Sequence, residues 1–513
     1  MARVPKPLQT AWLVVLTIVM AWRYGWVYQH APLGPGNAAP ATAWFGWADQ
    51  AAYYISARAW STLDLSASQH LYPAGYALLV APFYRLFPVE PFAVVNLLCW
   101  VASLWLFAAL GARLVKPLPL AGVVAATVFA VVEVADIRVL YTWEIPWTST
   151  PAATLTFAAL LLSVRQLEAP AVWQGVAAAV CAGLVALVRP TDALVVMPIT
   201  GILLLASILS DRRARAAMLI GTAGGFAFGP LLFVATHLLT QGWAPGRYLT
   251  LSRLIGFEPR LLPLRWVTLI LGPTPLYEAG EGFAIVYPYV LPGLAGIIVA
   301  LLVDRGRRLA HAAVGGGAVA MLCLYLCYRD LQVLGLFTMG NQHYFKWTLP
   351  VFALYSLFLV VITVQRRCLT RAAGAVLVVC VISVWRPVAV PGSLHASVLP
   401  DGTGLSLPDG LPDVTDRLDV RAPDDFLAIY YGDHTIDGLG RKYMAGVDFK
   451  AMPVRGGMAI IPLRPLSGPT VLHLSPSLQL DPHSPVRSFR QGIVLGIPCS
   501  VRKSRQVCRP PTP

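Results

Sequence analysis

An aspartate among aromatic residues is the strongest chemical signal in this sequence. Asp49 follows Trp47 and precedes Tyr53 and Tyr54. A carboxylate in an apolar setting has its charged form disfavoured by desolvation, which suits a general base. Aspartate is also a favoured first residue of helices, and DQAAYYISARAW has a helical pattern. A base and a helix cap are therefore both open for Asp49.

The composition determines what kind of elements can position this residue. The chain has 513 residues, of which 57% are hydrophobic and 12% charged. This excludes an ordinary soluble protein, because too little polar surface is available to cover globular cores. The first apolar run, residues 8–28, is about twenty residues long, and no small-residue cleavage site follows it. We interpret it as a retained membrane helix rather than a signal peptide.

Further apolar runs of similar length predict an α-helical polytopic membrane protein with about eleven spans, each near the twenty residues that cross a bilayer core. The predicted spans are residues 8–28, 91–112, 118–134, 147–164, 171–188, 191–209, 216–240, 284–303, 309–328, 347–364 and 372–390.

Basic residues predict the orientation of these spans. If the spans alternate, six basic clusters fall on one side, which should be the cytoplasm. These clusters contain Arg3, Lys6, Arg113, Lys116, Arg165, Arg212, Arg213, Arg215, Arg305, Arg307, Arg308, Arg366, Arg367 and Arg371. Basic residues on the opposite side are either anchors at the lipid interface or ligands of an anionic substrate at the outer leaflet.

The end of the chain has a different pattern. Residues 391–513 contain short apolar or alternating runs between Pro, Gly and Asp turns, which predicts a small soluble domain of mixed α/β or mostly β structure. An odd number of spans places this domain outside the cytoplasm. There, the spacing of Cys499 and Cys508 suits a disulfide that closes a hairpin, worth about 2–3 kcal/mol.

The loop at residues 29–90 is more than a connector. Its second half, HLYPAGYALLVAPFYRLFP, is hydrophobic enough to lie in the membrane interface. Pro82, Arg85 and Pro88 make it a poor spanning helix. We predict juxtamembrane helices packed against the outer leaflet.

Four segments in chain order carry a resemblance to a known family. Asp49 precedes a Y-P-x-G-Y segment, an acid precedes a helix-initiating proline, an Arg-Pro pair joins two spans, and a basic-aromatic segment leads into a Leu-Pro helix. The residues at these places are Tyr72, Pro73, Gly75 and Tyr76; Glu144 and Pro146; Arg189 and Pro190; and His343, Tyr344, Lys346 and Pro350. Over residues 8–390 the chain resembles GT-C glycosyltransferases of the protein O-mannosyltransferase and lipid A aminoarabinose transferase kind.

The resemblance implies a GT-C-like transmembrane domain at residues 1–390, with residues 29–90 as its catalytic loop, followed by the soluble domain at 391–513. It implies an inverting transferase in a bacterial inner membrane, with the soluble domain periplasmic. A polyprenyl-phosphate-linked sugar would be the donor, and an envelope glycan, lipid or protein the acceptor. Asp49 would deprotonate the acceptor hydroxyl at the outer face as it attacks the anomeric carbon.

The resemblance also implies binding residues. Cations near the departing lipid phosphate would stabilise its developing charge, and the candidates are Arg58, Arg189, Arg247, Arg253, His343 and Lys346. Aromatic residues could stack on the sugar or the prenyl chain, although belts at the interface are a common alternative. These candidates are Tyr53, Tyr54, Tyr76 and Tyr344.

The chain departs from the family beside Asp49. Many relatives have a second acid directly after the first, where this chain has Gln50. A second acid would have to come from Glu144 or Asp136 in the next outer loop. Because these loops have no D-x-D sequence, a divalent metal is possible but not favoured, and we expect no other cofactor.

A second class of function stays open. About eleven spans would also suit a secondary transporter or a flippase of lipid-linked sugars. Against it, the sequence shows no convincing internal repeat, and its charged residues concentrate in loops. In either case the lipid bilayer is an expected partner and nucleic acid is not.

Overall fold

The computed structural model describes most of the chain, and the structural statements below concern these residues only. They are residues 6–30, 48–88, 90–116, 120–210, 215–272, 281–329, 331, 335–338, 340–366, 369–383, 385–413, 416–421, 434–437, 442–444, 449–454, 457–473 and 479–495. The predicted disulfide between Cys499 and Cys508 lies outside them, as does the aromatic run before Asp49.

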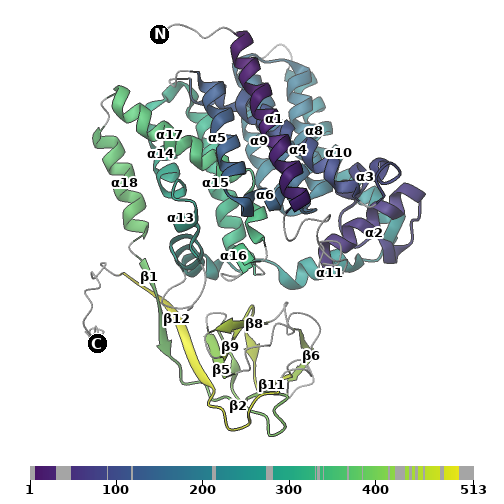
Figure 1. The fold of residues 1–513 in the computed structure, drawn as a ribbon, viewed down its shortest axis with the longest axis vertical. Coiled ribbons are helices and arrows are strands. Elements are labelled where there is room, and N and C mark those ends of the chain that lie inside the picture. Colours follow the sequence, from purple (N-terminus) through teal and green to yellow (C-terminus); the bar gives the residue numbers. More distant parts are fainter. Residues whose placement is uncertain are drawn as a thin grey trace.

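A bundle of helices forms the larger part of the molecule (Figure 1). Each apolar segment predicted from the sequence contains one helix of 14 to 27 residues. These helices are α1 (Lys6–His30), α4 (Pro91–Leu114), α5 (Ala121–Ala135), α7 (Ser149–Glu168), α8 (Val172–Val188), α9 (Pro190–Ser210), α10 (Arg215–Gln241), α14 (Val290–Val303), α15 (Arg308–Cys327), α17 (Thr348–Arg366) and α18 (Leu369–Ser383).

Fewer helices than the predicted eleven have the full length and hydropathy of a membrane span in the described part of the chain. In the described part of the chain, six helices are long and apolar enough, namely α1, α4, α9, α10, α15 and α17. A seventh span results if α6 (Ile137–Glu144) and α7, which meet at 96°, count as one. Helices α5, α8, α14 and α18 are apolar but shorter. The structure thus supports a helical protein with six or seven candidate membrane spans, and the larger number stays a prediction.

A proline explains why α14 is the shortest of these helices. The predicted span at 284–303 begins as α13 (Phe283–Val286), and the helix resumes only at Val290. Pro288 lies between the two pieces and lacks the N–H that a helix interior needs. Helix α14 has 14 residues, so it is about 21 Å long, less than the roughly 30 Å of a bilayer core.

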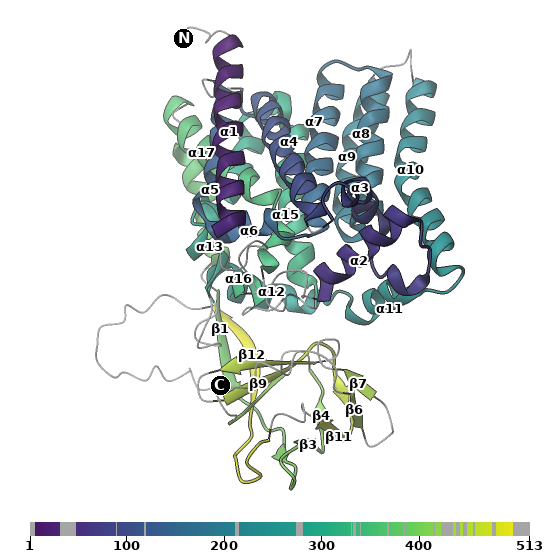
Figure 2. The same ribbon diagram turned by 45° about the vertical axis from the view of Figure 1, so that its right-hand side comes forward.

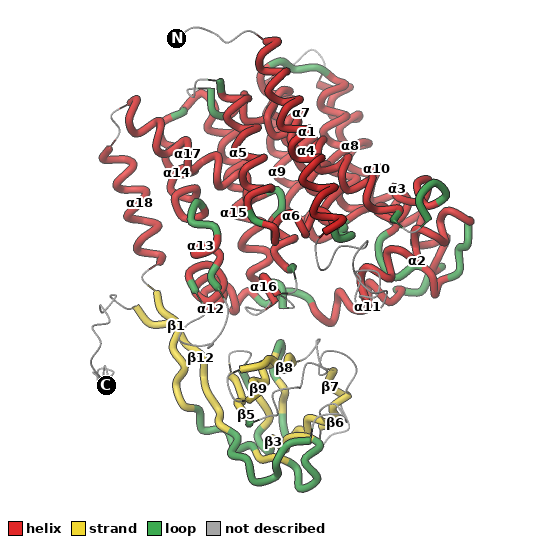
Figure 3. The backbone as a smooth tube through the Cα atoms, in the orientation of Figure 1, coloured by secondary structure: helices red, strands yellow, loops and turns green. Residues whose placement is uncertain are grey.

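Short helical elements gather toward the end of the bundle opposite the start of α1 (Figures 1 and 2). Loops connect them, as the tube view shows (Figure 3). They are α2 (Ala48–Thr62), η2 (Ala67–Gln69), α3 (Ala74–Tyr84), α6, α11 (Gly246–Ile255), η3 (Pro259–Leu261), α12 (Leu262–Arg265), η4 (Trp266–Leu271), α13, α16 (Gly335–Thr338) and η6 (Asn341–Phe345). A last short element, η5 (Arg305–Arg307), precedes α15.

Helices α2 and α3 occupy the predicted juxtamembrane region. Helix α3 has 11 residues, about 17 Å, which is too short to cross a bilayer core. Its second residue, Gly75, packs directly on the end of α8, since an added Cβ would lie 2.9 Å from the Leu187 carbonyl oxygen. The first loop is thereby fixed to the helix end that precedes Arg189.

Helices α8 and α10 touch backbone to backbone through glycines. A Cβ on Gly229 would lie 1.8 Å from the carbonyl oxygen of Gly183. A Cβ on Gly183 would lie 2.8 Å from the carbonyl oxygen of Gly225. Small residues allow this close approach, which stabilises helix pairs in membranes through van der Waals contact.

We expect Gly229→Ala to destabilise the protein, because the new methyl group can only be accommodated by moving α10 away from α8. Overpacking of this kind costs about 1–3 kcal/mol. Thermal unfolding in detergent measures the effect. Gly224→Ala is the matched control, since a Cβ at Gly224 on the same helix meets nothing within 4 Å. Equal unfolding temperatures for the two variants would contradict this packing.

Ion pairs lie at the end of the bundle where α1 begins. The carboxylate of Glu168 at the end of α7 pairs with Arg113 and, at 2.9 Å, with Lys116. Arg307 pairs with Asp304 at 2.7 Å between α14 and α15. These basic residues belong to the clusters predicted to face the cytoplasm, and that orientation stays a prediction.

In the described part of residues 385–495, every regular element is a strand. This fits the prediction of a mostly β domain better than that of a mixed α/β domain. The strands are β1 (Trp385–Pro391), β2 (Ser397–Val398), β3 (Gly404–Leu407), β4 (Gly410–Leu411), β5 (Asp416–Val420), β6 (His434–Asp437), β7 (Lys442–Met444), β8 (Phe449–Val454), β9 (Gly457–Pro462), β10 (Leu466–Ser467), β11 (Thr470–His473) and β12 (Arg487–Leu495).

Two five-stranded sheets organise this region, in the orders β1-β12-β5-β9-β8 and β2-β3-β11-β6-β7, and β4 pairs with β10. Fully buried Leu405, Leu418 and Phe449 belong to its own hydrophobic core. Strand β1 begins at Trp385, inside the predicted last span at 372–390, because its residues pair along β12 from Trp385 opposite Leu495. The boundary at 391 stays a prediction, as does a location outside the cytoplasm.

Candidate active site

Asp49 lies in the first turn of α2 and accepts a hydrogen bond from a tyrosine. The Tyr72 hydroxyl donates to Oδ1 of Asp49 at 2.5 Å, and Asp49 is half-buried. An acid in a first helical turn also interacts favourably with the helix dipole. The capping and base interpretations therefore both stay open, and the structure adds a phenol that fixes the carboxylate.

Tyr53 connects Asp49 to the helices of the bundle. It is one turn along α2, buried, and its ring centroid lies 4.7 Å from that of Tyr72. Burial and the charge of Asp49 raise the pKa of the Tyr53 phenol, whereas Arg189 and the Thr148 hydroxyl act in the opposite direction. Tyr53 therefore has Asp49 and Arg189 as electrostatic neighbours.

Gln50 has a structural contact where many relatives have an acid. Its side chain is buried, and Nε2 donates to the backbone carbonyl of Pro146 at 3.2 Å. This bond ties the first turn of α2 to the segment that leads into α7. An amide can donate to a carbonyl and a carboxylate cannot, so Gln50 suits this place.

Arg189 lies in a buried polar cluster at the junction of α8 and α9. Pro190 begins α9, which places Arg189 in the break between the two helices. Its Nε donates to Asp192 Oδ1 at 2.8 Å and to the Tyr325 hydroxyl at 2.9 Å. Its Nη1 donates to the Thr148 hydroxyl at 3.2 Å. The guanidinium is thus held by groups from three helix ends.

Two stacked tyrosine rings complete the surroundings of Arg189. The rings of Tyr325 and Tyr344 lie 4.4 Å apart at 15°. The Arg189 guanidinium carbon lies 4.8 Å from the Tyr344 centroid and 5.5 Å from that of Tyr325. Both distances are within the range of cation–π attraction. Tyr344 therefore contacts the cation, as well as being a candidate to bind sugar or lipid.

His343 presents a buried ring nitrogen next to this cluster. Its ring stacks on Trp147 at 3.9 Å and 9°, and Nδ1 lies 3.1 Å from the Ser149 hydroxyl. Nε2 is buried and has no hydrogen-bond partner among the described residues. Burial, together with the charges of Arg189 and Lys346, lowers the pKa of His343. The ring is therefore neutral and has an unused polar atom.

Lys346 is buried beside the same segment. Its Nζ donates to the Thr150 hydroxyl at 2.5 Å and lies 5.0 Å from the Trp143 ring centroid. The Trp143 indole donates to the Glu133 carboxylate at 2.5 Å. Burial, and next the charge of Arg189, lowers the pKa of Lys346. A bound anion would favour the protonated form of this amine.

The two candidate second acids lie in other surroundings. Glu144 is buried, with one carboxylate oxygen unpartnered among the described residues, and the cation that acts on it is Arg23 of α1. Asp136 pairs with Arg138 at 3.0 Å. The structure does not bring either acid into the described contacts of Asp49, and their catalytic role stays a prediction.

The remaining predicted binding residues are spread over the surface and the core. Arg58, Arg247 and Arg253 are exposed. The Tyr54 hydroxyl donates to the Pro88 carbonyl at 2.7 Å, on the side of α2 away from Asp49. Tyr76 is fully buried and donates to Asn96 at 2.6 Å. The structure therefore gathers Asp49 and Tyr53 with Arg189, His343, Tyr344 and Lys346. The Tyr76 ring lies 5.7 Å from that of Tyr53, and Arg247 lines a pocket beside Tyr72. Arg58, Arg253 and Tyr54 lie outside this group.

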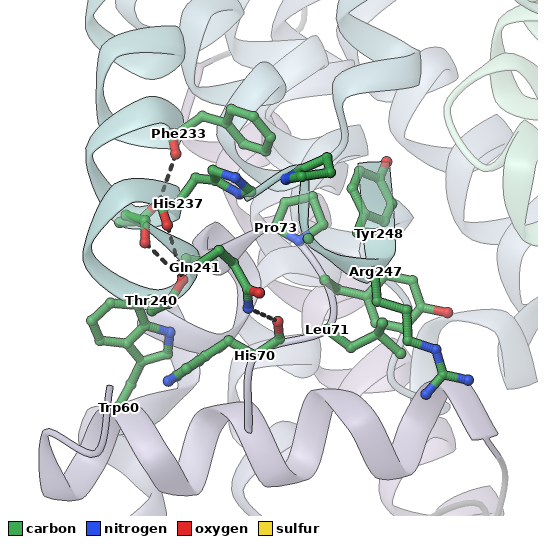
Figure 4. A pocket seen from close by; sticks show the side chains of 15 residues that line it. Trp60, His70, Leu71, Pro73, Phe233, His237, Thr240, Gln241, Arg247 and Tyr248 are labelled. Carbon is green, nitrogen blue, oxygen red and sulfur yellow. Dashed lines mark hydrogen bonds between the residues drawn. The ribbon is translucent and has the colours of Figure 1, made fainter. Parts of the chain in front are cut away.

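Two cavities adjoin these residues. A small pocket of about 30 Å³ lies beside Tyr72, and Arg247, Tyr248 and Gln241 also line it (Figure 4). A second cavity, of about 820 Å³, lies between α1, α5, α13 and α17, and Arg23, Asp136, Tyr287 and Tyr289 line it together with apolar side chains. Within the described ranges, no group of three or more His, Cys, Asp or Glu residues could hold a metal ion.

Three polar residues of the site were not predicted from the sequence. Asp192 pairs with Arg189, Tyr72 with Asp49, and Glu133 with Trp143. Glu133 could have been found, because a lone acid inside a predicted span usually has a functional or structural partner. Tyr72 was recognised as part of a motif only, since nothing local indicates what its hydroxyl contacts.

Comparisons with known proteins add weak structural likenesses. No protein family and no curated protein matches the sequence. The chain is similar to the apo oligosaccharyltransferase of Archaeoglobus fulgidus at 12% identity and a TM-score of 0.40, over 74% of this chain and 55% of that one. It is similar to arabinosyltransferase EmbB from Mycobacterium smegmatis at 13% identity and a TM-score of 0.28, over 96% and 65%. The chain thus spans less than two thirds of each, and likenesses this weak carry no argument.

Proposed function

We propose that this protein is an inverting GT-C-type glycosyltransferase with a polyprenyl-phosphate-linked sugar as donor. One observation carries the proposal: the Thr148 hydroxyl, which accepts a hydrogen bond from the buried Arg189 guanidinium at 3.2 Å, also hydrogen-bonds the Tyr53 phenol, one turn from Asp49 on α2. A carboxylate beside a buried cation at a membrane surface suits proton removal next to a leaving phosphate. The order of motifs in the sequence supports the same activity.

In the proposed reaction, Asp49 removes the proton from an acceptor hydroxyl. The acceptor oxygen forms a bond to the anomeric carbon while the bond from that carbon to the phosphate oxygen breaks. The electron pair of the broken bond stays on the phosphate, so polyprenyl phosphate leaves. Attack opposite the leaving group inverts the configuration. The Tyr72 hydrogen bond at 2.5 Å holds the carboxylate for this step.

The leaving phosphate needs positive charge and hydrogen-bond donors. Arg189 is already held in place by Asp192, Tyr325 and Thr148, so it requires little reorganisation. His343 contributes the unpartnered Nε2. Lys346 is buried close enough to Arg189 for the two charges to interact. Together these groups suit a phosphate better than a neutral ligand.

The lipid part of the donor fits the rest of the molecule. Six or seven candidate spans place the protein in a bilayer, where a prenyl chain partitions. We propose that the site faces the outside of a bacterial inner membrane, as the basic clusters at the other end of the bundle suggest. The acceptor hydroxyl would belong to an envelope glycan, a lipid or a protein.

Turnover of defined donors by purified protein tests the proposal. The protein in detergent is incubated with a panel of polyprenyl-phosphate sugars and an envelope extract as acceptor. Released polyprenyl phosphate and transferred sugar are both measured. We expect equal amounts of the two products with at least one donor. No release with any donor, together with movement of lipid-linked sugar across proteoliposomes, would instead favour the flippase alternative.

A further inference from the structure

The Tyr72 hydroxyl donates a hydrogen bond to the proposed base, and three elements fix the place of this tyrosine. It lies between η2 and α3, and Pro73 caps α3 directly after it. The preceding segment is tied to α10, because Gln241 Nε2 donates to the His70 carbonyl at 2.8 Å and to the Ala67 carbonyl at 3.1 Å. Figure 4 shows the bond to His70.

The ring of Tyr72 is held as firmly as its backbone. It packs against Tyr53 of α2 at 4.7 Å and against Tyr248 of α11 at 5.8 Å. Tyr248 in turn interacts electrostatically with Arg189. The hydroxyl that reaches Asp49 is therefore positioned by α2, α3 and α11 together.

The phenol is a suitable permanent donor to a carboxylate. Burial and the negative charge of Asp49 raise the pKa of Tyr72 far above its usual range, so the hydroxyl keeps its proton. A donor to one carboxylate oxygen favours the ionised form of the acid. It also fixes the rotation of the carboxylate.

We propose that Tyr72 is a positioning residue for catalysis, whose hydroxyl orients the Asp49 carboxylate toward the acceptor hydroxyl. The inference rests on the proposed function, because it needs Asp49 to act as the base. It adds a residue that neither the sequence motifs nor the comparisons assign to a role. Tyr72 acts through Asp49 and does not itself exchange a proton with the substrate.

Tyr72→Phe tests this role, because it removes one oxygen and keeps the ring between Tyr53 and Tyr248. We expect kcat/KM to fall about 10-fold, the usual value of a hydrogen bond to a charged group. The rise of activity with pH, which follows ionisation of the base, should move about one pH unit higher. The KM for the donor should change little.

Tyr84→Phe is the matched control, since it removes a phenol that contacts Tyr54 at 3.3 Å on the other side of α2. It should leave the pH profile in place. An unshifted profile in Tyr72→Phe, or a lower unfolding temperature as its only effect, would overturn the inference. Failure of the proposed function is distinguishable, because wild-type protein would then release no polyprenyl phosphate at any pH.

Discussion

Asp49→Asn is expected to lower turnover of the polyprenyl-phosphate donor by about 10²–10⁴-fold, the usual contribution of a general base. The amide has nearly the same shape as the carboxylate, and its oxygen can still accept the Tyr72 hydrogen bond. It cannot take a proton from the acceptor. Because the phosphate is assigned to other residues, the KM for the donor should stay close to that of wild type.

Asp64→Asn provides the matched control for this substitution. Asp64 belongs to the same loop, residues 29–90, but its Oδ1 accepts the backbone N–H of Ser66 at 2.9 Å in an exposed turn. Turnover by this variant should equal that of wild type. If Asp49→Asn retained full activity while folding normally, the base would have to be another acid, and Glu144 or Asp136 would be tested next.

Arg189→Gln is expected to have the second largest effect on turnover of the donor. Removal of one preorganised donor to a developing anion lowers kcat by about 10²–10³-fold. The variant should also be less stable, because Asp192 would be left buried without its cation, which costs about 3–5 kcal/mol. Steady-state kinetics and thermal unfolding in detergent measure the two effects separately.

A double variant separates catalysis from folding at this place. Arg189→Gln combined with Asp192→Asn removes both charges, so much of the lost stability should return. Activity should stay low, because the phosphate still lacks its guanidinium. Recovery of activity together with stability would contradict the assignment and would make Arg189 a purely structural residue.

Apolar runs were a good guide to where helices lie, because a bilayer requires segments with internal hydrogen bonding and apolar side chains. They do not by themselves give the length of each helix. The segment at 284–303 is apolar throughout, yet Pro288 divides it into α13 and α14. The segment at 372–390 ends as strand β1, whose pairing with β12 depends on residues about a hundred positions later.

The candidate site was partly predictable from helical periodicity. Asp49 and Tyr53 are four residues apart and share a face of α2. Arg58 falls on the exposed face with Ile55, which the same periodicity could have indicated. The contacts of Arg189 with Tyr325 and Tyr344 could not be predicted, because they join residues more than a hundred positions apart.

The second acid also could not be chosen from the sequence, because the choice depends on contacts between distant residues. The sequence leaves Glu144 and Asp136 as candidates because both lie in the loop before Pro146, but the cation acting on Glu144 is Arg23. Glu133, which lies inside a predicted span, accepts a hydrogen bond from the Trp143 indole, and the Lys346 amine lies against the ring of the same tryptophan. Sequence position identifies residues that enter the same loop, whereas side-chain direction depends on how α5, α6 and η6 pack.

The most direct test of the proposed site is a structure of the Asp49→Asn protein with a bound polyprenyl-phosphate sugar. We expect phosphate oxygens within about 3 Å of the Arg189 guanidinium and of a donor on His343 or Lys346. The anomeric carbon should then face residue 49. A donor phosphate bound elsewhere, such as at Arg23 in the cavity between α1, α5, α13 and α17, would contradict it.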